Sequence, residues 1–312
     1  MKKFWGKILH RIRRLYGGKN TPLEILLYIL LYCVDNSIKA VTRKDFNFRC
    51  KPMLNRNERK YRTGNYYTLK EVHLPLLDPV TSILFWGSVF QEIFEVYLEH
   101  NDCYDEIEMS SYCNPVMEES YGLRNNFVNV TVGSDDVVLD VGSWIGDFAA
   151  YASAKGAITY AFEPSDTVFD YLLQTAELNK NIYPIKKGLG ATKDIVAFSN
   201  DINNSIGDAI IPGKITGGEE ENVIEITTID AFVEENNLTR VDFIKADIEG
   251  YERYMLEGAK ETLKRFAPKL AICTYHLPDD PEVLANLIKD ANPNYNIVQK
   301  RRKLYASLPN AT

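Results

Sequence analysis

The second part of the sequence predicts a doubly wound α/β domain whose sheet is mostly parallel, with an antiparallel last strand. From about residue 126, short runs of β-branched residues alternate with helical stretches, which is typical of a parallel sheet covered on both faces. The last two runs are joined by a turn too short for a crossover helix, so they should pair antiparallel. We therefore divide the chain into a mainly helical N-terminal segment, residues 1–114, and an α/β domain, residues 115–312.

The expected elements follow one another as strand and helix along this domain. Parallel strands are expected at Val137–Val141, Ile158–Phe162, Ile182–Lys186, Val241–Lys245 and Leu270–Thr274. Helices are expected near Ile145–Lys155, Thr167–Lys180, Tyr254–Arg265 and Pro281–Ala291. Two final strands, Tyr295–Lys300 and Lys303–Ser307, should form a hairpin that places the reversed last strand at the edge of the sheet.

Two strand-like runs interrupt this alternation between Ile195 and Ile229. They are joined by a loop rich in glycine, asparagine and acidic residues, Asn203–Glu221. A solvated hairpin explains this pattern, and so does a flap over a binding site, because long loops of compact domains often carry function. The sequence leaves both interpretations open.

The N-terminal segment combines basic and apolar stretches. Residues 1–20 hold seven lysines and arginines and no acid, and the apolar run Ile25–Val34 is about ten residues long. Such a run is too short to span a bilayer. We interpret it either as a helix that packs on the domain or as part of a peripheral membrane contact through residues 1–34. The steps between apolar residues in Pro79–His100 predict an amphipathic helix.

The overall composition is that of a globular protein without affinity for nucleic acid. The chain has 312 residues, of which 45% are hydrophobic and 25% charged, and its net charge is −7. Nucleic-acid binding favours a basic face, which this balance does not supply. Five cysteines are scattered without a CxxC pair. They predict reduced thiols in a cytoplasmic protein rather than a disulfide framework.

The stretch VVLDVGSWIGDF, residues 137–148, predicts a ligand-binding turn at the carboxyl edge of the sheet. Gly142 permits a backbone angle or a close approach that a side chain would block, and Gly146 should let the helix lie close to the strand. Asp147 suits the positive end of that helix. The glycines are spaced G-x-x-x-G, unlike a dinucleotide fingerprint, and Asp140 would repel a pyrophosphate. Asp140 can instead accept hydrogen bonds from the ammonium of an amino acid, directly or through water.

The second strand ends in AFEP, which places Glu163 23 residues beyond Asp140. At this position a doubly wound domain presents a carboxylate to the two hydroxyls of a ribose. A nucleoside that carries an amino acid fits both acids, so we predict an S-adenosylmethionine site. Its candidate cofactor-binding residues are Asp140, Gly142, Ser143, Trp144, Gly146, Asp147, Glu163, Pro164, Gly188 and Asp247.

The fourth and fifth strands predict the reacting end of the site. Asp247 and Glu249 follow the fourth strand, and His276 follows the fifth. An imidazole of ordinary pKa, about 6.5, suits the removal of a proton from a hydroxyl. Asp247 can orient that imidazole, hold an acceptor hydroxyl or bind a metal, whereas Glu249 can do the same or cap the next helix. The spacing shows no dedicated metal site, although Asp279 and Asp280 could join these acids around a cation.

The stretches VVLDVGSWIGDF, AFEP, VDFIKADIEGYE and KLAICTYHLPDD together resemble the FkbM-type family of S-adenosylmethionine-dependent methyltransferases. The resemblance covers roughly residues 115–308. It implies a Rossmann-like class I methyltransferase fold and O-methylation of a hydroxyl of a sugar, glycan or secondary metabolite, as in polysaccharide biosynthesis. His276 is then the candidate general base, with Asp247 and Glu249 beside it.

Trp144 departs from the family pattern, in which this residue is usually small or an amide. The indole either narrows the cofactor pocket or points into the interface between sheet and helix. Together with the unmatched N-terminal segment, it leaves a second interpretation open. The chain would then be a cofactor-binding or assembly protein that keeps the fold without transferring a methyl group. Isothermal titration together with a methyl-transfer assay separates the two.

Overall fold

The computed structural model describes residues 61–69, 71–78, 81–82, 85, 121–199, 209–210 and 223–309. The chain from Tyr61 onward forms one compact unit. The expected contact through residues 1–34 and most of the Pro79–His100 helix lie outside the described residues. Within the described ranges, every helix is too short or too polar to cross a membrane.

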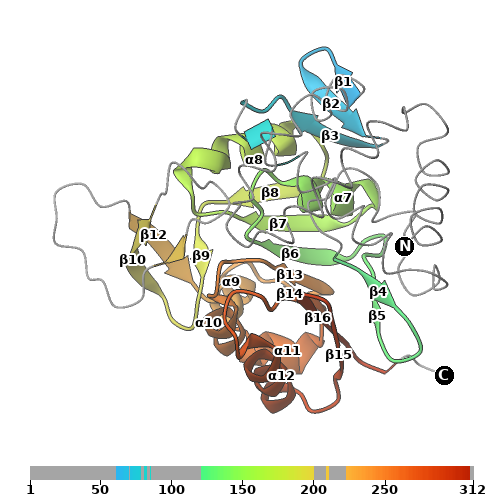
Figure 1. The fold of residues 1–312 in the computed structure, drawn as a ribbon, viewed down its shortest axis with the longest axis vertical. Helices are drawn as coiled ribbons and strands as arrows, with labels where there is room; N and C mark the ends of the chain where they lie inside the picture. Colours follow the sequence, from blue (N-terminus) through green and yellow to red (C-terminus); the bar gives the residue numbers. More distant parts are fainter. Residues whose placement is uncertain are drawn as a thin grey trace, which may run out of the picture. The chain divides into compact units, whose positions relative to one another are not determined.

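The core of this unit is a seven-stranded sheet in the order β15-β16-β14-β13-β6-β7-β8 (Figure 1). Strands β8, β7, β6, β13 and β14 are parallel, and β16 is antiparallel to both of its neighbours. The doubly wound prediction is therefore confirmed. The strands are β6 Val137–Val141, β7 Ile158–Phe162, β8 Ile182–Ile185, β13 Phe243–Ala246, β14 Lys269–Cys273, β15 Asn296–Lys300 and β16 Lys303–Ser307.

The final hairpin differs from the prediction in its placement. The reversed last strand, β16, lies inside the sheet between β14 and β15, and β15 forms the edge. All five residues of β16 are buried, whereas β15 has none that is fully buried. Because the inner position excludes more apolar surface from water, the more apolar strand of the pair occupies it.

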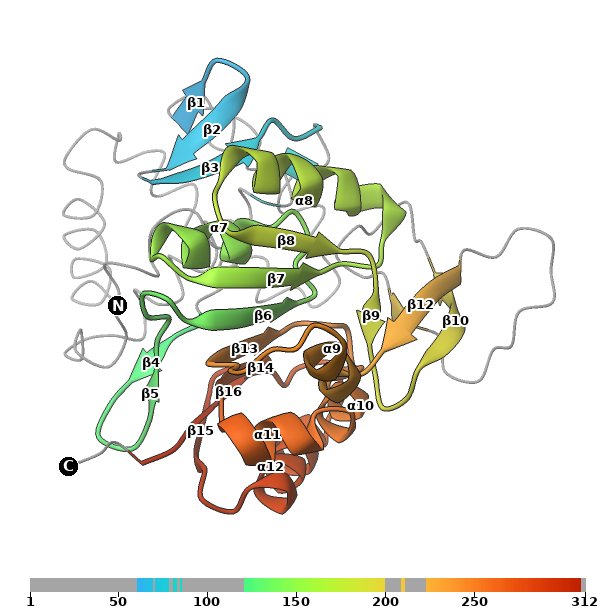
Figure 2. The same cartoon turned by 180° about the vertical axis from the view of Figure 1, so that it is seen from behind.

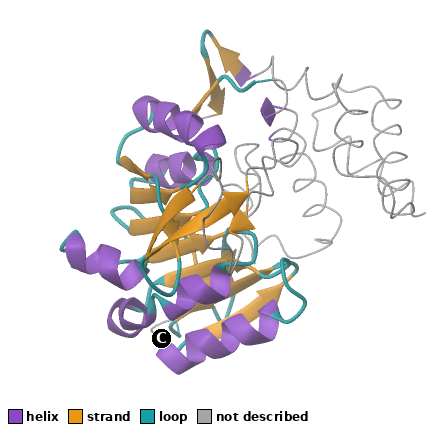
Figure 3. Ribbon diagram, turned by 90° about the vertical axis from the view of Figure 1, so that its left-hand side faces the viewer, coloured by secondary structure: helices purple, strands orange, loops and turns teal. Residues whose placement is uncertain are grey.

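Helices cover both faces of the sheet (Figure 3). Phe148 of the first helix contacts Phe243 on one face, while Leu139 and Phe162 belong to the core cluster shared with the later helices. The predicted helix Tyr254–Arg265 is two short helices that meet at Gly258, and one short helix, α9, was not predicted. The helices are α7 Asp147–Ala154, α8 Asp166–Leu178, α9 Ile229–Glu235, α10 Glu252–Glu257, α11 Lys260–Phe266 and α12 Asp280–Ala291.

A smaller sheet, in the order β11-β10-β12-β9, follows β8 and extends away from the central sheet (Figure 2). Its two long strands pair antiparallel, as the sequence predicts for the interruption between Ile195 and Ile229. The loop residues 200–208 and 211–222 lie outside the described part, so the choice between solvated hairpin and flap stays a prediction. The strands are β9 Gly188–Leu189, β10 Asp194–Ser199, β11 Ala209–Ile210 and β12 Val223–Thr227.

Three short strands lie within residues 62–75, in the segment expected to be mainly helical. The three strands pair antiparallel, and the last of them packs against α8. The His73 amide donates to Asn179 Oδ1 at 3.2 Å, and Asn179 Nδ2 donates back to the His73 carbonyl at 2.6 Å. This sheet therefore belongs to the same compact unit as the α/β domain. The short strands are β1 Arg62–Thr63, β2 Tyr66–Leu69, β3 Val72–Pro75, β4 Leu123–Arg124 and β5 Asn129–Val130.

Candidate active site

The glycine turn after β6 is held against two neighbouring strands. The amides of Gly142 and Ser143 both donate to the carbonyl of Phe162 at the end of β7, at 3.0 and 2.9 Å. Gly142 has a φ of +74°, and a Cβ placed there would lie 2.0 Å from the backbone oxygen of Asp247. Both the conformation and the close approach require glycine at this position.

Gly146 is required for a different contact from the one predicted. It precedes α7 with a φ of +83°, and a Cβ there would lie 2.7 Å from Leu172 Cδ1 on α8. The crowding therefore comes from the neighbouring helix rather than from the strand. Asp147 is the first residue of α7, where its carboxylate meets the positive end of the helix, as expected.

Trp144 occupies a strained position within the turn. Its φ of +50° is unusual for a residue with a side chain, and the residue is only 9% exposed. The ring lies 6.2 Å from that of Phe85. The indole Nε1 is buried without a hydrogen-bond partner among the described residues. A buried donor of this kind is what a polar ligand can satisfy.

Glu163 connects the turn to the loop that follows β7. Its carboxylate accepts hydrogen bonds from the amides of Trp144 and Ser165, both at 2.9 Å. Pro164 lies between the two bonded residues of this loop. The two backbone amides therefore orient the carboxylate of Glu163.

The remaining predicted cofactor residues lie around this turn. Ser143 is buried, and its hydroxyl donates to the carbonyl of Asp140 at 2.7 Å, so it stabilises the turn itself. Gly188 begins β9 just beyond β8 and pairs with Ile226 of β12. The structure therefore brings Gly188 to the same end of the sheet as Glu163, but within the backbone of the smaller sheet.

Asp140 is fully buried beside a lysine that the sequence interpretation missed. Lys245 lies opposite Asp140 in the register of β6 and β13, and its Nζ is 3.1 Å from Asp140 Oδ1. The same ammonium donates to the carbonyl of Gly142. Burial disfavours this charge, but the carboxylates of Asp140, Asp247 and Asp147 outweigh it and raise the pKa of Lys245 above its ordinary value. The ammonium beside Asp140 is thus the protein's own. A charged residue inside the apolar run FIKA was the available signal.

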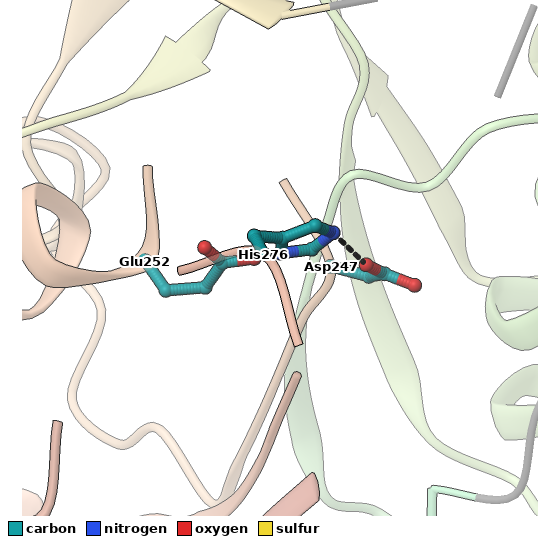
Figure 4. Close-up of side chains that lie close together, drawn as sticks. All are labelled: Asp247, Glu252 and His276. Carbon is teal, nitrogen blue, oxygen red and sulfur yellow. Dashed lines mark ion pairs between the residues drawn. The ribbon is translucent and has the colours of Figure 1, made fainter. Parts of the chain in front are cut away.

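His276 lies between carboxylates (Figure 4). Its Nδ1 is 3.0 Å from Glu252 Oε1, and its Nε2 is 3.4 Å from both Asp247 Oδ1 and Glu249 Oε2. The imidazole side chain is only 7% exposed. Burial disfavours the imidazolium, but the contact with Glu252 and the charges of Asp247 and Glu249 outweigh it and raise the pKa of His276 to about 9. At neutral pH the ring is therefore protonated.

Glu252, which the sequence interpretation did not single out, fixes the loop after β13. It is fully buried and accepts the amides of Ile248 and Gly250, both at 2.9 Å. Glu252 therefore holds the backbone of the loop that leads into α10. Glu249 has a φ of +54°, and its side chain is directed to His276. Strain of this kind is common at functional sites.

Two tyrosines hold Asp247. The hydroxyl of Tyr121 donates to Oδ2, and that of Tyr275 donates to Oδ1, both at 2.9 Å. Two ammonium groups lie close to the ring of Tyr121, with Lys245 Nζ 5.1 Å and Lys303 Nζ 4.7 Å from its centre. Neither tyrosine was predicted to be a site residue. Tyr121 is far from Asp247 in the sequence, and only the fold brings it to the tip of β13.

The donor types around His276 raise the question of a metal site. Asp247, Glu252 and His276 place ligand atoms within 4.8 Å of one another. However, the two carboxylates contact different nitrogens of one ring, so the imidazole itself separates them (Figure 4). Asp279 and Asp280 bond Arg253 instead, at 2.8 and 2.7 Å. The arrangement therefore favours an ionic chain over a chelating site.

The strand order, the glycine turn and the acids at the tips of β7 and β13 define a class I methyltransferase domain. Residues 136–296, about half of the chain, match the family described as Methyltransferase FkbM domain. The chain belongs to this FkbM methyltransferase family, as the sequence resemblance predicted.

Several known proteins are similar to this chain. Hexuronic acid methyltransferase AglP of Haloferax volcanii is 28% identical over 171 residues, which cover 54% of this chain and 67% of AglP. The crystal structure of methyltransferase FkbM from Methylobacillus flagellatus KT aligns with a TM-score of 0.44 and 19% identity, over 83% of this chain and 59% of that one. Aeropyrum pernix fibrillarin with bound S-adenosyl-L-methionine aligns with a TM-score of 0.37 and 14% identity, over 58% and 70%.

S-adenosylmethionine is the cofactor of this methyltransferase family. The turn suits such a ligand, because the buried Nε1 of Trp144 lacks a partner among the described residues and can donate to a polar group of the ligand. Glu163 stands at the tip of the next strand, where the cofactor's ribose is expected.

Proposed function

We propose that the protein transfers a methyl group from S-adenosylmethionine to a hydroxyl of a sugar or glycan. The similarity to a hexuronic acid methyltransferase supports a sugar acceptor. The S-adenosylmethionine sulfonium supplies the reactive methyl group. The role of the protein is to hold the cofactor and the acceptor hydroxyl in contact and to receive the hydroxyl proton.

One observation carries this proposal: the cofactor turn adjoins the acids around His276, which are Asp247, Glu249 and Glu252. The amide of Asp247 donates to the carbonyl of Val141 at 3.1 Å, and its own carbonyl lies against Gly142. A cofactor on the turn and a hydroxyl near the Asp247 carboxylate are therefore neighbours. Effective molarities of well-oriented groups account for a large share of such catalysis.

The turn residues and Glu163 bind the cofactor in this proposal. Glu163 would accept hydrogen bonds from the ribose hydroxyls, and the indole of Trp144 would donate to a polar group of the methionine moiety. Asp140 would act from beneath the turn through Lys245, since it is fully buried and already ion-paired.

The protonation of His276 changes the expected path of the acceptor proton. Because the pKa of His276 is raised to about 9, the imidazole can act as a general base only near or above that pH. At neutral pH the imidazolium would instead orient the carboxylates around it. Asp247, oriented by two tyrosine hydroxyls, is then the group that accepts the hydrogen of the acceptor hydroxyl.

The test is methyl transfer to a defined acceptor. Purified protein is incubated with S-adenosylmethionine carrying a labelled methyl group and with glycans that end in a hexuronic acid or in a neutral hexose. We expect label on a hydroxyl oxygen, located by NMR. Isothermal titration with S-adenosylhomocysteine runs in parallel. Binding without transfer to any of these glycans would support the alternative, a cofactor-binding protein without transfer activity.

A further inference from the structure

We propose that Lys245 is a positioning residue that sets the conformation of the cofactor turn, an inference that rests on the proposed function. Lys245 lies in the third position of β13, with its side chain 6% exposed. Its ammonium reaches the carboxylate of Asp140 and the carbonyl of Gly142, and its Nζ is 5.1 Å from the centre of the Tyr121 ring. One buried cation therefore joins three parts of the site.

The backbone bonds of the turn show what Lys245 contributes. The peptide unit before Gly142 is bonded at both ends, because Asp247 N donates to the carbonyl of Val141 and Gly142 N donates to Phe162. The next unit is also bonded at both ends. Its N–H, from Ser143, donates to Phe162, and its carbonyl, from Gly142, accepts from Lys245.

Lys245 supplies the side-chain bond in this set. Without it, the carbonyl of Gly142 would lose a charge-assisted hydrogen bond in a buried place. Glycine resists rotation of that peptide less than any other residue does. The next amide, from Trp144, is one of the two that orient Glu163. A shift of the Gly142 peptide would therefore move both sides of the cofactor site.

The chain contains a matched control for this arrangement. Lys269 begins β14 and donates to a backbone carbonyl, that of Thr131, at 2.6 Å and to an aspartate, Asp136, at 2.7 Å. Its side chain is 26% exposed. This second lysine lies at the amino end of the same sheet, away from the turn. It has the same type of partners without a role at the cofactor site.

The experiment measures S-adenosylhomocysteine affinity by isothermal titration for the wild type, K245M, K245R and K269M, well below each melting temperature. We expect K245M to bind roughly tenfold more weakly or worse, as the loss of a hydrogen bond to a charged group predicts. K245R keeps a cationic donor and should recover part of the affinity. K269M should bind like the wild type. Amide hydrogen exchange at Ser143 and Trp144 should be faster in K245M than in K269M.

The outcomes separate this inference from the proposed function. K245M binding within about twofold of the wild type would overturn the inference, as would an equal loss in K269M, which would indicate general destabilisation. If K245M does not fold, K245M/D140N removes the uncompensated buried charge, and exchange at the turn decides the question. A wild type that does not bind S-adenosylhomocysteine would overturn the proposed function itself and the inference with it.

Discussion

The Nδ1 of His276 lies 3.0 Å from Oε1 of Glu252, a fully buried carboxylate that also accepts two backbone amides of its own loop. Glu252 cannot turn away from the imidazole without losing both amide bonds. The pair therefore fixes the ring from one side, while Asp247 and Glu249 face the other nitrogen. At neutral pH a histidine surrounded in this way is protonated, so it pairs with these carboxylates and does not act as a base.

We expect the stability contributed by His276 to depend on pH. The folded pKa is about 9 and the ordinary value is 6.5, so the contribution is complete below 6.5 and is lost as the pH rises through 9. The groups that face the ring are Glu252, Asp247, Glu249 and Tyr275, whose own ring is tilted against the imidazole. Melting temperatures of the wild type and H276Q should differ more at pH 6 than at pH 9.5. If the difference in melting temperature does not change with pH, the ion pairs of His276 do not contribute to stability.

Asp247 should contribute more to turnover at neutral pH than His276 does. We expect D247N to lower kcat roughly 100-fold, the usual range for a group that receives a proton. H276Q should retain more activity at pH 7, because the imidazole that it lacks is already protonated in the wild type at that pH and cannot act as the base. The measurement is kcat and KM for both variants from pH 6 to 10. If kcat of the wild type rises with the loss of a single proton of pKa near 9, and H276Q shows no such rise, the base is His276.

Gly142 should not tolerate a side chain. A Cβ there would lie 2.0 Å from the Asp247 carbonyl, so G142A should abolish the rise in melting temperature that S-adenosylhomocysteine causes in the wild type. Gly64 is the control, because it has a φ of +62° but, apart from its chain neighbours, no atom of the described residues within 4 Å of its Cβ position. G64A should show strain of about 1 kcal/mol and keep the ligand response. An equal ligand response in G142A would contradict the close approach.

Glu163 should be needed for both turn and ligand. In E163Q one oxygen becomes an NH₂ group, which cannot accept from the amide of Trp144 or Ser165. We expect a loss of about 1–3 kcal/mol in the free energy of unfolding and roughly tenfold weaker binding of S-adenosylhomocysteine. Glu177, exposed on α8, offers the control E177Q. Unchanged affinity in E163Q would remove Glu163 from the cofactor site.

Asp230 should stabilise the fold without affecting the site. It lies on α9 and accepts bonds from Glu261 N, Thr262 N and Thr262 Oγ1, at 3.0, 2.8 and 2.6 Å, at the start of α11. We expect D230A to lower the free energy of unfolding by about 1–2 kcal/mol, as loss of a helix cap does. Urea unfolding measures this. Titration with S-adenosylhomocysteine should give the wild-type affinity, and a weaker one would connect α9 to the site.

The sequence predicted the local features of the fold. The strands Val137–Val141 and Ile158–Phe162 have the predicted bounds, because each is a short β-branched or aromatic run limited by turn residues. The placement of Gly142, Glu163, Asp247 and His276 at one edge of the sheet was predictable because residues that follow parallel strands meet there. These predictions depend on neighbours within a few residues.

Only the tertiary structure decided which charges meet. Asp140 and Lys245 are 105 residues apart, and the register of β6 and β13 makes them neighbours. Tyr121 reaches Asp247 from a stretch without a predicted element, and Glu252 raises the pKa of an imidazole in the loop after β14. The spacing of the strands along the sequence does not predict these contacts. They arise when buried charges must find partners within one low-dielectric interior, and that requirement acts on the folded chain as a whole.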